Sequence, residues 1–203
     1  SPLTSLKKLK LVGGCKNGDY YEDLLLKEYM IYKIQNMLSE MTFRVRLIRI
    51  TYSDNDDKVK PFTQFAFLME DVDDLAKRNN CKEIKNKKIL TNQTNREQTT
   101  FVNLFEYMIG NTDWSIPNLH NMKLIVPKSD TLAKPYVIPY DYDYSGLVDA
   151  VYAVPAEELG IETVKTRLYR GFPRGLNELN KCIALFNDKK GAIMNYVNHF
   201  DLC

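Results

Sequence analysis

The chain has 203 residues, of which 44% are hydrophobic and 27% charged, so it has the composition of a globular protein of one large domain or two closely packed lobes. Its 28 Lys and Arg against 26 Asp and Glu give a net charge of +2, which argues against wholesale binding to nucleic acid or to a membrane surface. Function is therefore expected to reside in a local site.

The cysteines do not predict a metal centre. Cys15, Cys81, Cys182 and Cys203 form no C-x-x-C pair, so a structural zinc site is not expected. Four reduced thiols are expected, with one or two disulfides as the alternative for an exported chain. No stretch approaches the roughly 18 apolar residues of a membrane span. We expect a soluble chain, either cytoplasmic or exported with its signal peptide removed.

Strand patterns surround one helix in the first 80 residues. The segment 6–12 alternates apolar residues with lysine and predicts a strand, whereas the apolar residues of 19–38 repeat with helical spacing. The segments 43–52 and 62–69 predict an antiparallel hairpin with a long polar loop. A short helix is expected over 70–78, where acidic residues begin the segment and basic residues end it.

Glu28 lies on the apolar stripe of the helix at 19–38, because it follows Leu24 by four residues and precedes Ile31 by three. A carboxylate on a buried face needs a partner. From the residues alone, Glu28 could extend to solvent or form a hydrogen bond with a tyrosine such as Tyr32.

The second part of the chain is expected to be mainly helical. The lysine-rich segment 81–88 has little periodicity and predicts a solvated loop or hairpin, and a helix is expected over 95–109, ending at Gly110. Two short strands and three further helices are then expected, at residues 122–126, 136–140, 156–168, 176–186 and 190–199.

These patterns predict an α+β fold with a lobe boundary near residues 75 to 90. Residues 1–80 would form an N-lobe of strands plus one helix. Residues 81–203 would form a helical C-lobe that carries loops rich in oxygen ligands.

Two segments contain the residues that could carry chemistry: GNTDWSIPNLHNMKLI at 110–125 and YVIPYDYDYSGLV at 136–148. In each, polar side chains adjoin a short apolar strand, so a β-ribbon would bring four of them to a common edge. The four are Asp113, Asn121, Asp141 and Asp143. Carboxylate and amide oxygens suit Mg²⁺, which also keeps positions open for substrate phosphates. Close carboxylates repel one another, and a bound cation relieves that repulsion.

The order of helix, Asp-containing loop, Asn, strand, turn, strand and Asp resembles the catalytic segment of protein-kinase-like proteins. With KLKLV near the start and IPYDYDYSG later, the chain looks most similar to the CotH-type (spore coat protein H) kinases and their secreted bacterial relatives. In those kinases a proline-aromatic-Asp-x-Asp stretch replaces D-F-G. The resemblance extends from Lys10 to about Gly146. It implies a two-lobed kinase-like fold with a reduced strand-rich N-lobe, a mainly helical C-lobe and a nucleotide cleft between them.

The resemblance also implies a role for each matched residue. Lys10 would hold the nucleotide phosphates, and Glu28 would pair with it. Glu70 and Asp71 would lie in the hinge, where backbone groups meet an adenine. Asp113 would orient the attacking hydroxyl or accept its proton.

Asn121 and Asp141 would hold the metal. Kinase spacing favours Asn118, five residues after Asp113, but Asn121 directly precedes the apolar strand and is preferred. Asp141 follows its strand at once, whereas Asp143 fits better when counted back from the next glycine, so both are kept as metal ligands.

The neighbouring residues have simpler expectations. Trp114 is expected to pack its loop against the helix at 95–109, and His120 to act as a hydrogen-bonding strut. Arg167, Arg170 and Arg174 are expected at a solvated helix end, with a clamp for an acidic substrate as the alternative.

The implied activity is that of an atypical kinase, which transfers a phosphoryl group from ATP, with Mg²⁺ or Mn²⁺, to a hydroxyl on a protein or small molecule. The sequence has no G-x-G-x-x-G loop, and the distance from Asp113 to Asn121 is stretched. The first alternative is therefore a catalytically inactive kinase-like binding or scaffold module. The second is a metal-dependent hydrolase that uses the same acids, in which Lys10 and Glu28 would have no purpose.

Overall fold

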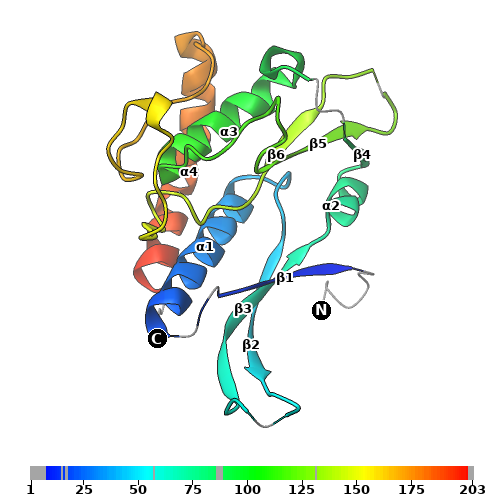
Figure 1. Ribbon diagram of the computed structural model, residues 1–203. Helices are drawn as coiled ribbons and strands as arrows, with labels where there is room; N and C mark the ends of the chain where they lie inside the picture. Colours follow the sequence, from blue (N-terminus) through cyan, green and yellow to red (C-terminus); the bar gives the residue numbers. More distant parts are fainter. Residues whose placement is uncertain are drawn as a thin grey trace.

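The computed structural model describes residues 8–14, 16, 18–56, 58–85, 89–130 and 132–200. Within these residues the chain forms two small antiparallel sheets and four α-helices (Figure 1). The α+β class is therefore confirmed.

The first sheet has the strand order β1-β3-β2 and is formed by β1 (Leu9–Gly13), β2 (Val45–Tyr52) and β3 (Phe62–Glu70). Strands β2 and β3 form the predicted hairpin, and β1 pairs antiparallel with the other edge of β3. Lys10 lies opposite Met69, and directly opposed residues share one face of a sheet. That face packs against helix α1 (Asp19–Leu38), where the ring of Tyr32 lies 5.6 Å from that of Phe67.

The second sheet has the order β4-β5-β6 and is formed by β4 (Cys81–Ile84), β5 (Met122–Pro127) and β6 (Tyr136–Pro139). Helix α2 (Val72–Arg78) links the two sheets. Helix α3 (Arg96–Ile109) packs against β6, and helix α4 (Leu176–Asn198) packs against both α1 and α3 (Figure 1).

One hydrophobic core joins both sheets to the helices. Ile31 of α1, Phe67 of β3, Phe105 of α3, Leu124 of β5 and Val137 of β6 are each 0% exposed and belong to the same cluster. Complete burial of a large apolar side chain stabilises a fold by about 1.5–3 kcal/mol. The two sheets therefore share one hydrophobic core.

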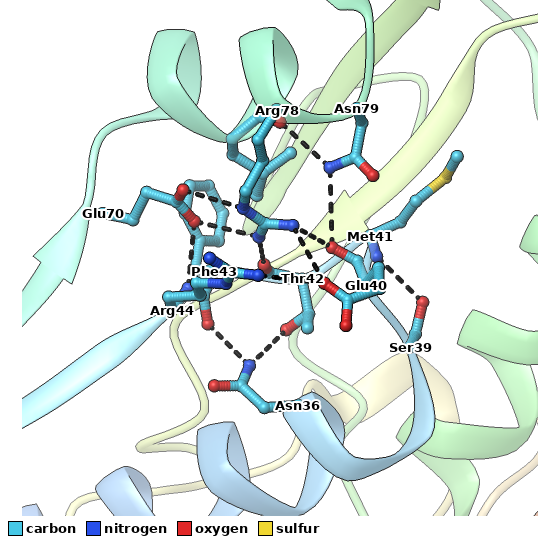
Figure 2. Close-up of polar contacts among 11 residues, drawn as sticks. Asn36, Ser39, Glu40, Met41, Thr42, Phe43, Arg44, Glu70, Arg78 and Asn79 are labelled. Atoms are coloured by element: carbon cyan, nitrogen blue, oxygen red, sulfur yellow. Dashed lines mark hydrogen bonds and ion pairs between the residues drawn. The ribbon is translucent and has the colours of Figure 1, made fainter. Parts of the chain in front are cut away.

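A network around Arg78 holds the junction between the first sheet and α2 (Figure 2). The Arg78 guanidinium donates hydrogen bonds to both carboxylate oxygens of Glu70, at 2.9 and 3.0 Å, and to the carbonyl groups of Glu40 and Thr42. The Glu70 carboxylate also accepts the backbone N–H of Arg44 at 3.1 Å. Arg78 thus ties the α1–β2 loop, the end of β3 and α2 together.

The predicted limits of α1 are confirmed, and those of α3 differ by one residue at its start. Helix α3 begins after Asn95, whose side chain accepts the N–H of Gln98 at 3.0 Å. It ends at Gly110, whose φ of 72° is a left-handed conformation that glycine adopts without a steric penalty.

The prediction of a solvated segment at 81–88 is wrong for its first part, because residues 81–84 form β4. Residues 86–88 of that segment lie outside the described residues. Strand β4 pairs with β5, and Cys81 lies opposite Pro127. The two strands are 40 or more positions apart along the chain, so local periodicity could not reveal their pairing. The second part of the chain therefore contains a sheet and is less helical than predicted.

The helices predicted after residue 150 also differ from the structure. The helix expected over 156–168 is wrong, because this segment contains only the 3₁₀ turn Glu157–Leu159, which ends at Gly160 with φ of 64°. The two helices expected over 176–186 and 190–199 are one continuous helix, α4. It passes through Gly191, since one internal glycine costs only about 1 kcal/mol.

No helix in the described part of the chain combines the length and the apolar character needed to cross a membrane.

Candidate active site

The loop after α3 fixes the backbone around Asp113. The N–H of Asn111 donates to the carbonyl of Glu106 at 2.8 Å, and the Asn111 side-chain oxygen accepts the N–H of Asp113 at 3.0 Å. Gly110 has little space around it, because a Cβ there would lie 3.2 Å from the Val164 carbonyl. Asp113 is therefore held at a defined place directly beyond the end of α3.

Asn121 lies against Asp113, as the sequence predicts. Its side-chain nitrogen donates to the Asp113 backbone carbonyl at 2.8 Å and to the Asp113 carboxylate at 3.0 Å. The other Asp113 oxygen lies 2.8 Å from Nε2 of His120. Asn118 is exposed, and its N–H faces Ser115 Oγ at 3.4 Å. The structure thus brings Asn121, rather than Asn118, to the Asp113 carboxylate.

One face of α1 holds the segment that carries Asp141. The Tyr32 hydroxyl oxygen accepts the N–H of Asp141 at 2.9 Å, and a Glu28 carboxyl oxygen accepts the N–H of Tyr142 at 3.4 Å. The buried Tyr142 hydroxyl donates to Gln35 Oε1 at 2.8 Å. Glu28, Tyr32 and Gln35 follow one another by four and three residues, so they form a single stripe along the helix.

Glu28 is buried beside other acids. It is 7% exposed, and its pKa is raised to about 8, first by burial and then by the charges of Asp141 and Asp143. The Tyr142 N–H and the charge of Lys10 act in the opposite direction. Glu28 therefore interacts electrostatically with the predicted metal ligands Asp141 and Asp143 and with the predicted phosphate-binding residue Lys10.

Asp143 interacts electrostatically both with Asp141 and with Asp113 in the loop after α3. Burial raises the pKa of Asp143 first, and the charges of Asp141 and Asp113 raise it further. The hydroxyl of Tyr152, 3.1 Å from the Asp143 carboxylate, lowers it. The predicted catalytic acid and the predicted metal ligands thus lie within electrostatic reach of one another.

Lys10 approaches this cluster without closing an ion pair. Its ammonium nitrogen lies 5.7 Å from the centroid of the Tyr140 ring. Among the described residues no carboxylate lies within 4.0 Å of it, so its effect on Glu28 acts through space.

Two of the predicted metal ligands have an unusual backbone. Asn121 has φ of 53° and Asp141 has φ of 69°, both in the left-handed region that non-glycine residues adopt at a cost of about 1–2 kcal/mol. Their places are stabilised from outside, since the Asn121 carbonyl accepts the N–H of Tyr140 at 3.0 Å and Tyr32 binds Asp141. Such conformations concentrate at functional sites.

Both residues of the predicted hinge, Glu70 and Asp71, form hydrogen bonds with protein groups. The Glu70 carboxylate binds Arg78, and the Glu70 N–H donates to the Arg44 carbonyl at 2.9 Å. The Asp71 side chain accepts the N–H of Asp73 at 2.9 Å and caps α2, while its carbonyl accepts helical N–H groups. The Glu70 carboxylate is therefore occupied by protein groups, and an adenine contact through the remaining backbone groups of Glu70 and Asp71 stays a prediction.

The oxygen donors fit a hard cation by their chemistry, although no set of three His, Cys, Asp or Glu side chains in the described ranges is spaced to hold a metal. The donors are one amide and two carboxylates, from Asn121, Asp141 and Asp143. Asn121 uses its nitrogen to bind Asp113, which leaves its oxygen for a ligand. A bound cation would relieve the repulsion that raises the pKa of Asp143.

The sequence did not identify Arg170 as a part of this site. Its guanidinium donates to the carbonyl groups of Thr112 and Trp114, the latter at 2.9 Å, and lies 5.1 Å from the centroid of the Trp114 ring. These carbonyls flank Asp113 on both sides. The other arginines also bind protein groups, for example Arg167, which donates to the Met108 carbonyl at 3.0 Å. Arg167 and Arg170 are exposed, as expected, but residues 161–175 form no helix, so the helix end expected there is wrong.

Comparison of the chain with models of protein families, with curated proteins and with solved structures finds no match.

Proposed function

We propose that the chain is an atypical kinase, which transfers a phosphoryl group from ATP to a hydroxyl on a protein or small molecule with the help of Mg²⁺ or Mn²⁺. The observation that supports this most is the convergence of six residues from four segments of the chain on one place: Lys10, Glu28, Asp113, Asn121, Asp141 and Asp143.

Phosphoryl transfer depends on positioning and on neutralisation of charge, and the six residues divide these tasks. Asp113, oriented by His120 and Asn121, would align the acceptor hydroxyl and accept its proton. Asn121, Asp141 and Asp143 would hold the divalent cation, which neutralises phosphate charge when bound. Lys10 would bind the phosphates from the side of the first sheet.

In this proposal the first sheet and α1 form a reduced N-lobe, and the second sheet with α3 and α4 forms the C-lobe. The nucleotide would lie between them, with its base toward the junction that Arg78 stabilises. The position of Lys10 on the face of the first sheet that packs against α1 supports this division.

The alternative of a non-catalytic nucleotide-binding module has support from Glu28. The pKa of Glu28 is raised to about 8, so its carboxyl group is protonated at neutral pH. Lys10 has no carboxylate of the described residues within ion-pair distance, so Lys10 and Glu28 form no ion pair without a ligand. A metal-dependent hydrolase is a weaker alternative, because it would give these two residues no task.

Turnover of ATP separates the kinase from the non-catalytic module. Loss of the γ-phosphoryl group from ATP, by transfer or by hydrolysis, is measured with Mg²⁺ or Mn²⁺ for the wild type, Asp113→Asn and the exposed control Asp188→Asn on α4. Removal of a catalytic base slows a reaction by about 10²–10⁴-fold, so Asp113→Asn is expected to lose turnover while it still binds ATP. Wild-type binding without turnover would indicate the scaffold, and full turnover in Asp113→Asn would contradict the proposed role.

A further inference from the structure

A second lysine reaches the same aromatic ring as Lys10, but from the other sheet. The ammonium nitrogen of Lys123, on β5, lies 5.7 Å from the centroid of the Tyr140 ring, and that of Lys10, on β1, lies at the same distance. Strands β1 and β5 belong to different sheets (Figure 1). Tyr140 therefore brings one cation from each sheet to the place directly before Asp141.

The positive charge at this place is only partly compensated. Lys123 has one carboxylate within ion-pair distance, that of Glu83 at 3.5 Å, and Glu83 also pairs with Lys85 at 3.6 Å. Within the described ranges Lys10 has none. Lys123 and Lys85 thus share the carboxylate of Glu83, and Lys10 has no carboxylate of the described residues within ion-pair distance, so the region around Tyr140 keeps positive charge that attracts an anion.

Acidic side chains lie next to these lysines, beginning with Asp141, the residue after Tyr140. Asp141 and Asp143 lie close enough to Glu28 for their charges to add to the effect of burial on its pKa. The charge of Asp113 likewise adds to the rise in the pKa of Asp143. A cationic region therefore adjoins an acidic one. A polyphosphate with a bound divalent cation has the complementary order, since its phosphate oxygens suit the lysines and its cation suits the acids.

We infer that Lys123 is a second phosphate-binding residue, which contacts the polyphosphate of the nucleotide from the second sheet as Lys10 does from the first. This inference rests on the proposed function and extends it to a residue outside the predicted motifs. The sequence lacks the glycine-rich loop that covers the phosphates in other kinases. A lysine with three donors on a fixed strand supplies an alternative source of contacts.

The position of Lys123 supports a defined contact. Its backbone lies in the central strand of the second sheet, opposite Ile138, and its side chain is 37% exposed. The stem is thus partly covered, and the ammonium group has the Tyr140 ring as a weak partner that an anion can replace.

The test compares binding of Mg²⁺-tripolyphosphate and Mg²⁺-ATP by calorimetry in the wild type, Lys123→Met, Lys123→Arg and Lys128→Met. Methionine keeps the apolar stem, arginine keeps the charge, and Lys128 is an exposed lysine just beyond β5. Loss of a hydrogen bond to a charged group weakens binding by roughly tenfold or more. Lys123→Met is expected to show this loss for both ligands, whereas Lys123→Arg and Lys128→Met bind nearly as the wild type does.

The outcomes separate this inference from the proposed function. If Lys123→Met binds ATP more weakly but tripolyphosphate normally, Lys123 contacts the base or ribose and the phosphate assignment is overturned. If it binds both normally while Asp141→Ala binds neither, the inference fails and the proposed function stands. If the wild type binds neither ligand, both fail. Thermal unfolding of each variant checks its fold, and Lys123→Gln replaces Lys123→Met if the latter is unfolded.

Discussion

Replacement of Glu28 by Gln is expected to stabilise the protein without ligand at pH 8 and to leave its stability at pH 5 nearly unchanged. Glu28 is 7% exposed, and its neighbours Asp141 and Asp143 add to the burial that raises its pKa to about 8. Glutamine has the size of the protonated carboxyl and keeps an oxygen that can accept the N–H of Tyr142.

The sign and the size follow from proton linkage. Between the unfolded pKa of 4.5 and the folded pKa of about 8, the folded protein holds a proton at Glu28 that the unfolded chain has lost, so stability falls as the pH rises through this range. The difference between these two pKa values, at 1.36 kcal/mol per pH unit, sets an upper limit of about 5 kcal/mol. We expect a gain between about 1 and 5 kcal/mol at pH 8.

Urea unfolding at pH 5, 6.5 and 8, followed by circular dichroism, measures the effect in the wild type, Glu28→Gln and the exposed control Glu158→Gln. Glu106 is also buried with a pKa raised to about 8, but its contribution is common to all three proteins and cancels in the comparison. Glu28→Gln should gain stability progressively above pH 5, and the control should not. A loss of stability at pH 8 would mean that Glu28 is ionised and paired in the protein without ligand, and would refute the reasoning.

Three further outcomes are expected. Arg170→Ala should lower the rate of phosphoryl transfer while nucleotide affinity is kept, and added guanidinium should restore part of the rate; an equal loss in Arg167→Ala would argue against positioning of the loop. Arg78→Ala should lower the free energy of unfolding in urea by about 3–5 kcal/mol, because it leaves the Glu70 carboxylate buried and unpaired, and a change below 1 kcal/mol would contradict this. Mn²⁺ should raise the melting temperature more at pH 8 than at pH 6, because protons compete for the acids; a shift that persists in Asp141→Ala would place the cation elsewhere.

Local pattern was sufficient where a segment is defined by its own neighbours in the sequence. The 3.6-residue period gave the limits of α1, and Gly110 marked the end of α3, because each depends on residues within one or two turns. Asn121, preferred over Asn118 because it directly precedes a strand, is the one whose side chain reaches the Asp113 carboxylate, while its role as a metal ligand stays a prediction.

Local pattern was insufficient where the partner lies far along the chain. Strand β4 depends on pairing with β5, and the clamp of Arg170 on Trp114 joins residues 56 positions apart. Gln35 is an exception that the sequence could have shown, because it continues the stripe of Glu28 and Tyr32 at helical spacing. The predicted helix at 156–168 is wrong because the segment forms only short turns, the first of which ends at Gly160 in a left-handed conformation. The Arg167 side chain of this segment binds the Met108 carbonyl of α3.

Calorimetric titration of ATP in the presence and absence of Mg²⁺ tests the central claim most directly. The proposed site predicts saturable binding that requires the divalent cation, is lost in Asp141→Ala and is kept in Asp188→Ala on the exposed face of α4. A ligand at 100 times its Kd should also stabilise the fold by about 2.7 kcal/mol. Binding that is independent of the cation, or that is unchanged in Asp141→Ala, would contradict the claim that these residues form a metal-nucleotide site.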